Sequence, residues 1–272
     1  MTVAAEDFEL VRSLVLERSA IALDGKEYLV EARLAPLVER EGLGSVADLA
    51  RLLRSGSARL SDEVVEAMTT NETSFFRDVH PFEALRTSIM PSLLDANGRV
   101  DLWSAGAATG QEAYSIALMV AEHFPSRPGI SILATDLSRA VLERAKAGVF
   151  TQMEVNRGLP AALLVKYFER SGREWCLRPQ VRSQVTFKQL NLVGSLASVP
   201  PMDIIMLRNV LIYFEPAVKK QVLDKVARVL RPGGYLFLGS AETTYGVHDG
   251  FERLELGRAI CYRKTREGTS CP

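Results

Sequence analysis

Apolar residues recur at spacings of three and four between Ala5 and Ala67, and this is the periodicity of short amphipathic helices. Phe8, Val11 and Leu14 begin the pattern, and glycines separate its later stretches. Pro36 lies inside one stretch, so we expect a helix that begins or bends there. Residues 1–70 are therefore predicted to form a small all-α domain.

The pattern changes to alternating strands and helices from about residue 86 onward. The strand candidates RVDLWSAG and GISILATD alternate with the helix candidates GQEAYSIALMVAEHF and SRAVLERAKAGVF. After a less regular region from Thr151 to Pro179 come QVTFKQLNL, PMDIIMLRNVLIYF, the helical PAVKKQVLDKVARVLRPGG, YLFLGSAE and RAICYRK. Strands separated by helices of this length predict an α/β fold with a doubly wound, mainly parallel, Rossmann-like sheet.

Composition narrows the classes of function. With 272 residues, 47% of them hydrophobic, and a formal net charge of zero, the chain can bury a core but lacks the basic excess that binds nucleic acid. Cys176, Cys261 and Cys271 lack metal-ligand spacing, so we expect reduced thiols and no metal site. The acidic start and the absence of an apolar run of about 20 residues predict a cytoplasmic protein without direct membrane insertion.

Small residues fill the turn after the first predicted strand, namely Ala105, Gly106, Ala107, Ala108 and Gly110. Such a turn lets a ligand approach the backbone, although tight packing of strand against helix explains it equally well. The next strand ends in Asp136, whose carboxylate can accept hydrogen bonds from both hydroxyls of a ribose. Together the turn and the acid favour a nucleoside ligand.

Glu112 in the first turn of the following helix bears on which nucleoside binds. There is neither a GxGxxG turn nor a Gly-Lys-Ser/Thr motif, and an anion at this position would repel a pyrophosphate. It would instead pair with the amino group or the sulfonium of S-adenosylmethionine. The alternative is a carboxylate placed favourably against the helix macrodipole, which is worth about 0.3–1 kcal/mol.

The segment TTNETSFFRDVHPFEAL stands between the two predicted domains and is unlike a flexible linker, which would be rich in Gly, Ser and Pro and free of aromatic residues. Burying Phe75 and Phe76 is worth about 1.5–3 kcal/mol each, so we expect both to anchor the segment in the core. The polar residues around them are then fixed in place to contact something.

Five motifs in order, TTNETSFFRD, LWSAGAATGQEAYSIAL, ATDLSRAVLERAKAGVF, FKQLNL and LRNVLIYF, make the chain resemble the CheR family of chemotaxis receptor methyltransferases over nearly its whole length. The resemblance implies a helical domain over 1–70, a cofactor-closing linker over 71–85 and an S-adenosylmethionine-dependent methyltransferase domain over 86–272. It implies a protein-glutamate O-methyltransferase that esterifies glutamates on the cytoplasmic helices of methyl-accepting chemotaxis receptors, releases S-adenosylhomocysteine and acts as a monomer.

The resemblance also implies a site. Its cofactor contacts are Asn71, Thr73, Arg77, Gly106, Glu112, Asp136, Asn191, Leu192, Arg208 and Asn209, with Asn191 and Leu192 at the adenine. Ser104 stands where methyltransferases usually have an acid, so Glu112 is expected to contact the methionine amino group. Independently of the family, Arg208 and Asn209 follow the buried run DIIML, where an unpartnered polar side chain would be costly.

Esterification of a glutamate needs no strong base, because a carboxyl group with a pKa of about 4.3 is already ionised near neutral pH. The enzyme has to align the reacting groups and exclude water. We therefore expect Arg77 and Tyr213, the two predicted catalytic residues, to orient the substrate carboxylate without carrying protons.

The receptor-docking surface stays open. Lys26, Arg33 and Arg40 would form one basic stripe on a continuous helix, but such stripes are usually solvated faces. Family members that bind a receptor tail use a small antiparallel extension, and RSGREWCLRP is short, so we predict a tail-independent mode. Two rival functions are a methyltransferase for nucleic acids or small molecules, since VPPM partly matches an amino-methylating motif, and a regulatory module without turnover.

Overall fold

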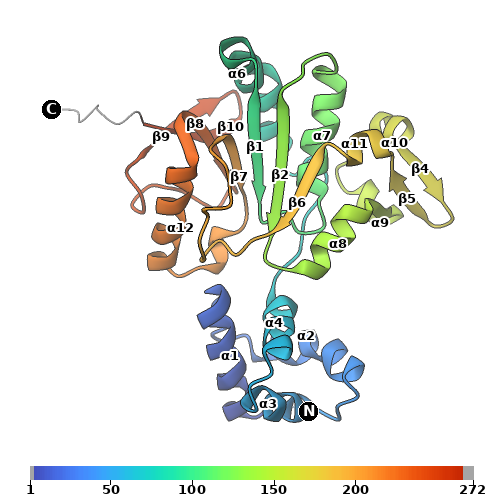
Figure 1. Cartoon of the computed structure of the whole chain (residues 1–272), viewed down its shortest axis with the longest axis vertical. Coiled ribbons are helices and arrows are strands. Elements are labelled where there is room, and N and C mark those ends of the chain that lie inside the picture. The colour runs from blue at the N-terminus through green and yellow to red at the C-terminus, as the bar shows by residue number, and fades with distance from the viewer. Residues whose placement is uncertain (1–2, 266–272) are drawn as a thin grey trace. The chain divides into compact units, whose positions relative to one another are not determined.

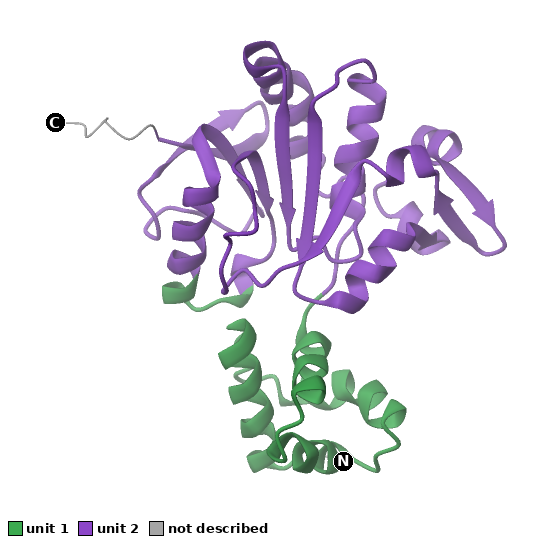
Figure 2. Cartoon of the chain, viewed as in Figure 1, with its two compact units in different colours: residues 1–70, 213–218 green, residues 71–212, 219–272 purple. Residues whose placement is uncertain are grey.

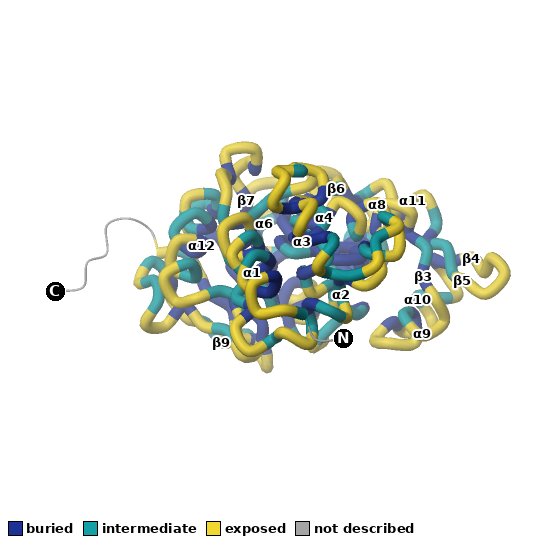
Figure 3. Tube along the Cα trace, turned by 90° about the horizontal axis from the view of Figure 1, so that it is seen from below, coloured by how far each residue is buried: buried dark blue, intermediate teal, exposed yellow. Residues whose placement is uncertain are grey.

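The computed structural model describes residues 3–265, and Cys271 lies outside this range. The chain divides into two compact units (Figure 2). The helical unit contains residues 1–70 and 213–218, and the sheet unit contains residues 71–212 and 219–272. Buried positions lie inside each unit, and exposed positions lie on outer helix faces and in loops (Figure 3).

The helical unit is built from short amphipathic helices, as the spacing predicts. Its helices are α1 (Ala5–Ser19), α2 (Glu27–Arg40), α3 (Val46–Arg54) and α4 (Ala58–Met68). Ser45 and Ser57 begin α3 and α4 because each side chain accepts a backbone N–H of the first turn. Pro36 lies inside α2 on an exposed face, so the helix does not begin there.

The predicted basic stripe of α2 is bound to its own unit. Lys26 donates to a backbone carbonyl one turn away, and Arg40 forms an ion pair with Glu63 of α4. Arg33 donates to the carbonyls of Met68 at 2.6 Å and Thr69 at 3.2 Å. Arg33 therefore secures the end of α4, where the chain leaves this unit, and Lys26 and Arg40 bind other groups of the same unit.

Within residues 3–265 the sheet unit contains a seven-stranded sheet in the order β6-β2-β1-β7-β8-β10-β9 (Figure 1). Its strands are β1 (Val100–Ala105), β2 (Ile130–Asp136), β6 (Val185–Gln189), β7 (Met202–Leu207), β8 (Leu230–Leu238), β9 (Phe251–Leu256) and β10 (Ala259–Lys264). The pairs from β6 to β8 are parallel, and β10 runs antiparallel to β8 and β9. The mainly parallel, doubly wound sheet is confirmed.

Helices cover the sheet. They are α5 (His80–Ala84), η1 (Leu85–Ile89), α6 (Met90–Asn97), α7 (Gln111–His123), α8 (Arg139–Ala147), α11 (Pro179–Arg182) and α12 (Pro216–Val229), with the short η2 (Leu211–Tyr213) after β7. All six residues of β7 are buried, and the core continues into α7 through Tyr114, Ile116 and Leu118. Continuous apolar strands of this kind are typical of parallel sheets covered on both faces.

A smaller antiparallel sheet, in the order β3-β5-β4, forms within the region whose sequence looked irregular. It contains β3 (Val149–Thr151), β4 (Phe168–Ser171) and β5 (Glu174–Leu177), together with α9 (Gln152–Asn156) and α10 (Ala161–Tyr167). These elements are too short for periodicity to reveal, and each gains its stability from packing on its neighbours.

Three further stretches differ from the sequence expectation. The predicted helix over 216–234 stops at Val229, and β8 starts at Leu230 with a register shift opposite β7. Pro232 cannot continue a helix, and the Arg231 guanidinium pairs with Asp101 of β1 and Asp203 of β7. The strand β9 and the helical run from His80 to Asn97, with Pro81 in its first turn, were not predicted.

Candidate functional site

The carboxyl ends of β1 and β7 meet where the strand order reverses, which is where open α/β sheets bind ligands. The turn after β1 is fixed there by the backbone of β2, because the N–H groups of Gly106 and Ala107 both donate to the Thr135 carbonyl, at 2.8 and 2.9 Å. A Cβ on Gly106 would lie 2.6 Å from Val210 Cγ2. Only glycine fits here, because its φ is 80° and the Val210 side chain packs directly on it, and this close packing fixes the course of the turn.

Asp136 ties this turn to the end of β2. One carboxylate oxygen accepts the N–H of Ala108 at 2.8 Å, and the other accepts the N–H of Ser138 at 3.0 Å. Ala108 has a φ of 48°, and the charged acceptor stabilises this left-handed backbone. An ionised carboxylate has about four acceptor positions, so Asp136 can hold the loop and still accept from a ribose.

Glu112 points from the start of α7 toward the end of β1, where Ser104 Oγ donates to its Oε1 at 2.8 Å. Its Oε2 accepts Nη1 of Arg208 at 3.0 Å. Only 12% of the Glu112 side chain and 1% of the Arg208 side chain are exposed. The two predicted cofactor contacts are therefore brought together as a desolvated ion pair, which sequence alone did not foresee.

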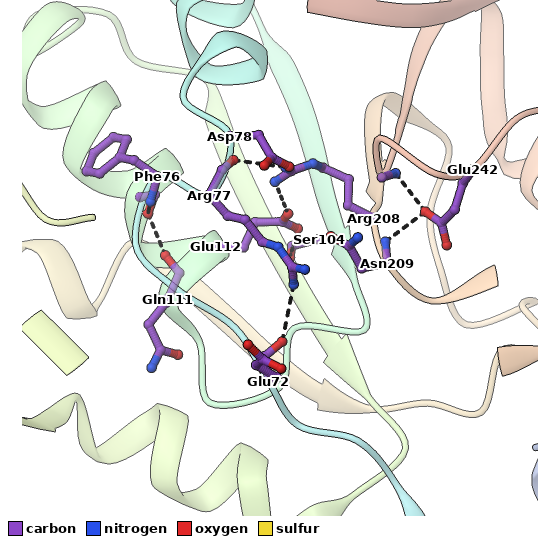
Figure 4. A network of polar contacts seen from close by, with 12 residues as sticks. Glu72, Phe76, Arg77, Asp78, Ser104, Gln111, Glu112, Arg208, Asn209 and Glu242 are labelled. Carbon is purple, nitrogen blue, oxygen red and sulfur yellow. Dashed lines mark hydrogen bonds and ion pairs between the residues drawn. The ribbon is translucent and has the colours of Figure 1, made fainter. Parts of the chain in front are cut away.

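Arg208 also reaches the segment between the two predicted domains (Figure 4). Its Nη2 donates to the carbonyl of Arg77 at 2.8 Å and to Asp78 Oδ2 at 2.6 Å. The Phe82 ring centre lies 5.9 Å from the guanidinium carbon, within cation–π range. The single buried guanidinium of Arg208 therefore binds both Glu112 at the start of α7 and the segment that contains Arg77 and Asp78.

Residues 71–85, called the covering segment below, have an unusual backbone. Phe76, Asp78 and Val79 have φ values of 45°, 65° and 45°. Non-glycine residues in this region are strained, so the surroundings must hold the segment in place. Phe75 is fully buried, and its ring packs edge-on against Phe150 at 5.0 Å, while the Phe76 N–H donates to a side-chain oxygen of α7 at 2.8 Å.

The two phenylalanines thus have different environments. Phe75 lies at the centre of the core, whereas Phe76 is partly buried and stacks edge-on against Phe82 at 5.2 Å. A Cβ on Gly158 would lie 2.0 Å from the Phe75 carbonyl oxygen, so the loop after α9 also presses against this segment. Both rings anchor the segment, as the sequence predicted.

Asn209 follows Arg208 and has a φ of 58°. Its backbone N–H donates to Glu242 Oε2 at 2.7 Å. Within the described part of the chain, its Oδ1 is buried and has no hydrogen-bond partner, and the same holds for Nε of Arg208. A buried acceptor without a partner is costly unless a ligand supplies a donor.

The remaining predicted contacts lie around this centre. Asn71 and Thr73 line a cleft of about 460 Å³, together with Thr109 and Gln111 of the turn before and at the start of α7. Leu192 is buried just after β6, and Asn191 Oδ1 accepts the N–H of Val193 at 3.1 Å. The Leu190 N–H donates to the Asp136 carbonyl at 2.9 Å, which brings Asn191 and Leu192 to the carboxyl edge beside β2.

The two predicted catalytic residues are less tightly placed. Arg77 Nη1 donates to the Glu72 carbonyl at 3.4 Å, and the fork of the guanidinium offers further donors to a ligand. Tyr213 is grouped with the helical unit, where its carbonyl accepts the N–H of Ala22 at 3.4 Å. The catalytic roles of both residues stay predictions.

Sequence reasoning missed Asp78 and Glu242. Asp78 directly follows a predicted contact, and its charge could have suggested a partner for the buried arginine. Glu242 lies shortly after β8, at the same edge of the sheet as the other site residues. A polar residue that follows a buried parallel strand is the signal that would have found it.

Comparisons with known proteins place this site in a family. Residues 71–260 match the CheR methyltransferase SAM binding domain, and residues 6–69 match the CheR methyltransferase all-alpha domain. The chain belongs to the CheR family. Its cofactor is accordingly S-adenosylmethionine, as the sequence predicted.

Curated CheR relatives match over nearly their whole length. Chemotaxis protein methyltransferase 1 from Pseudomonas aeruginosa is 40% identical over 97% of this chain and 99% of its own. Chemotaxis protein methyltransferase Cher2 from Pseudomonas putida is 39% identical over 94% and 97%. Among solved structures, the N-methyltransferase NodS from Bradyrhizobium japonicum is 16% identical, with a TM-score of 0.38 over 70% of this chain and 99% of that one.

The residues of this CheR chain fit the cofactor. The partly buried carboxylate of Glu112 and the orphaned Oδ1 of Asn209 suit a ligand that carries a cationic donor. The Asp136 carboxylate lies at the same edge of the sheet, and its oxygens are acceptors of the kind that suit ribose hydroxyls. No helix in the described part is long and apolar enough to cross a bilayer.

Proposed function

We propose that this methyltransferase esterifies glutamate side chains on the cytoplasmic helices of methyl-accepting chemotaxis receptors, yielding glutamate methyl esters and S-adenosylhomocysteine. The observation that carries the proposal is the buried Arg208 guanidinium, which joins Glu112 to the covering segment at Arg77 and Asp78. That arrangement fixes charged groups and hydrogen-bond donors beside one another, and this suits the orientation of a substrate that is already ionised.

The predicted contacts divide the work at the site. Bound S-adenosylmethionine supplies an electrophilic methyl group on a sulfonium. Glu112 would hold the amino group of its methionine part, Asp136 the ribose, and Asn191 with Leu192 the adenine. Arg208 would hold the Glu112 carboxylate in position. Its ion pair at 3.0 Å, together with the hydrogen bond from Ser104, restricts rotation of that carboxylate.

Arg77 and Tyr213 would orient the substrate carboxylate. A planar guanidinium can bind a carboxylate through two parallel hydrogen bonds, which fixes the direction of the attacking oxygen. The buried Phe75 ring and the hydrogen bonds from Arg208 hold the strained segment in place, and the segment would then help to exclude water from the site. Positioning of this kind raises the rate without a general base.

The proposal is tested by incubating the purified protein with S-adenosylmethionine labelled in its methyl group and receptor-containing membranes of its own cells. The expected result is label on a receptor-sized protein that is released as methanol by mild alkali, as a methyl ester would be. Glutamate-to-alanine changes at the labelled positions should abolish it. Alkali-stable label, or label on nucleic acid or small molecules, would contradict the proposal.

A further inference from the structure

Glu242 gathers backbone groups from two strands of the sheet at the edge of the site (Figure 4). Its Oε2 accepts the N–H of Asn209 at 2.7 Å and the N–H of Gly239 at 2.6 Å, and its Oε1 accepts the N–H of Ile212 at 3.1 Å. Asn209 follows β7 and Gly239 follows β8. The carboxylate therefore joins the ends of both strands.

The backbone at Asn209 depends on this acceptor. A φ of 58° is left-handed, a conformation that asparagine tolerates better than most residues but that still needs support. A charged acceptor on its N–H provides that support, because hydrogen bonds to an ionised group are stronger than neutral ones. Without it, the N–H groups of Asn209 and Gly239 would lose their acceptor.

The side chain of Asn209 is fixed by the same cluster. A Cβ on Gly239 would lie 2.6 Å from Asn209 Nδ2 and 2.8 Å from Glu242 Oε2. The amide nitrogen thus packs closely over a residue without a side chain, and this leaves Oδ1 as the orphaned acceptor. The direction in which Oδ1 points is set by how Glu242 and Gly239 hold the residue.

We propose that Glu242 is a positioning residue of the cofactor site, which orients the Asn209 amide toward the methionine part of S-adenosylmethionine. The inference rests on the proposed function in that the site binds S-adenosylmethionine for methyl transfer, and it adds Asn209, with its orphaned Oδ1, as a contact of that cofactor. Both carboxylate oxygens of Glu242 are bonded to the backbone, so its effect on the ligand passes through Asn209.

The test measures binding of S-adenosylhomocysteine by isothermal titration calorimetry, together with the melting temperature, for Glu242→Gln and Glu242→Ala in the full chain. An amide can keep only one of the two acceptor oxygens, so Gln should raise Kd roughly tenfold and Ala should raise it further. The matched control is Asp203→Asn near the start of β7, the strand that leads to Asn209. The Asp203 carboxylate accepts the Asp101 N–H at 2.8 Å. The control variant should lower the melting temperature and leave Kd unchanged.

A double-mutant cycle separates positioning from general stability. Asn209→Gly removes the amide while tolerating a left-handed backbone. In that background Glu242→Gln should weaken binding by less than twofold, because the group it orients is gone. Additive losses would overturn the inference, as would wild-type affinity in folded Glu242→Gln.

If neither Glu242 variant folds, Gly239→Ala serves in their place. Its methyl group would press on both the Asn209 amide and the Glu242 carboxylate and disturb the contact between the two residues, so Kd should still rise roughly tenfold. An unchanged Kd would overturn the inference. Failure of the wild-type chain to methylate receptors while it binds S-adenosylhomocysteine would count against the proposed substrate and leave the role of Glu242 standing.

Discussion

Arg208 and Glu112 form an ion pair inside the sheet unit, with Nη1 3.0 Å from Oε2 and only 1% of the arginine side chain exposed. The pair joins β7 to the start of α7, and its arginine continues to Asp78 in the covering segment. The ion pair between Arg208 and Glu112 should therefore contribute to the stability of the fold as well as to ligand binding.

Arg208→Met should destabilise the protein by about 3 kcal/mol, because it leaves the carboxylate of Glu112 desolvated and without its partner. The free energy of unfolding in urea measures this. Arg208→Met combined with Glu112→Gln should be less destabilised than the sum of the single variants, since the second change removes the unpaired charge. Strict additivity would show that the pair is not coupled.

Arg77→Ala should reduce turnover by roughly a hundredfold or more, since a misoriented carboxylate seldom attacks productively. Arg77→Lys should recover little, because an ammonium lacks the planar fork. The melting temperature should change little, as the hydrogen bond of this guanidinium within residues 3–265 is a long one, 3.4 Å to a backbone carbonyl. Initial rates with receptor membranes measure the effect, and Arg86→Ala on the exposed face of η1 serves as the control.

The wild-type rate should be flat between about pH 6.5 and about pH 8.5, because a glutamate substrate is ionised throughout this range and no group has to carry a proton. The measurement is kcat at saturating substrate. A steep ionisation inside the window, lost on substitution of one side chain, would identify a proton carrier and refute orientation as the sole role of Arg77 and Tyr213.

Phe75→Ala should destabilise the protein by about 3–5 kcal/mol, because a fully buried ring is removed from between Phe150 and Phe168. Phe76→Ala should have a smaller effect, as that ring is only partly buried. Both values come from chemical unfolding. Equal losses would show that the covering segment is anchored equally by the two rings.

Protonation of Asp101 in acid should lower the free energy of unfolding. Burial raises the pKa of its carboxyl group, but hydrogen bonds from Ser131 and Arg231 and the charge of Arg231 outweigh burial and hold the pKa below its usual range. A lowered pKa stabilises the folded state above the unfolded value of about 3.9, and this contribution is lost as the pH falls through the lower folded value.

The free energy of unfolding should therefore fall as the pH drops below about 4, and Asp101→Asn should flatten this part of the curve. Urea unfolding at a series of pH values measures the slope. The control is Asp95→Asn, whose partner Arg127 is exposed, and it should leave the slope nearly unchanged. An unaltered slope in Asp101→Asn would exclude this carboxyl group as its source.

Local sequence patterns were sufficient to predict the long helices and strands. The helical spacing from Phe8 onward and the apolar runs before Asp136 and Arg208 each follow from side chains that share one face or one strand. Short elements such as β4, β9 and α10 escaped, because segments of four to seven residues carry too little periodicity and depend on their neighbours.

The sequence alone determined the fold class, the CheR family and the residue types available for a sulfonium nucleoside, since all three depend on order and spacing along the chain. Only the tertiary structure decided which of those residues meet. It placed Arg208 between Glu112 and Asp78. It also brought Glu242 to the backbone N–H of Asn209, and Arg33 of α2 to the end of α4. Such contacts join positions far apart in the chain, and burial makes each polar group bind whichever partner the packing of strands and helices brings within reach.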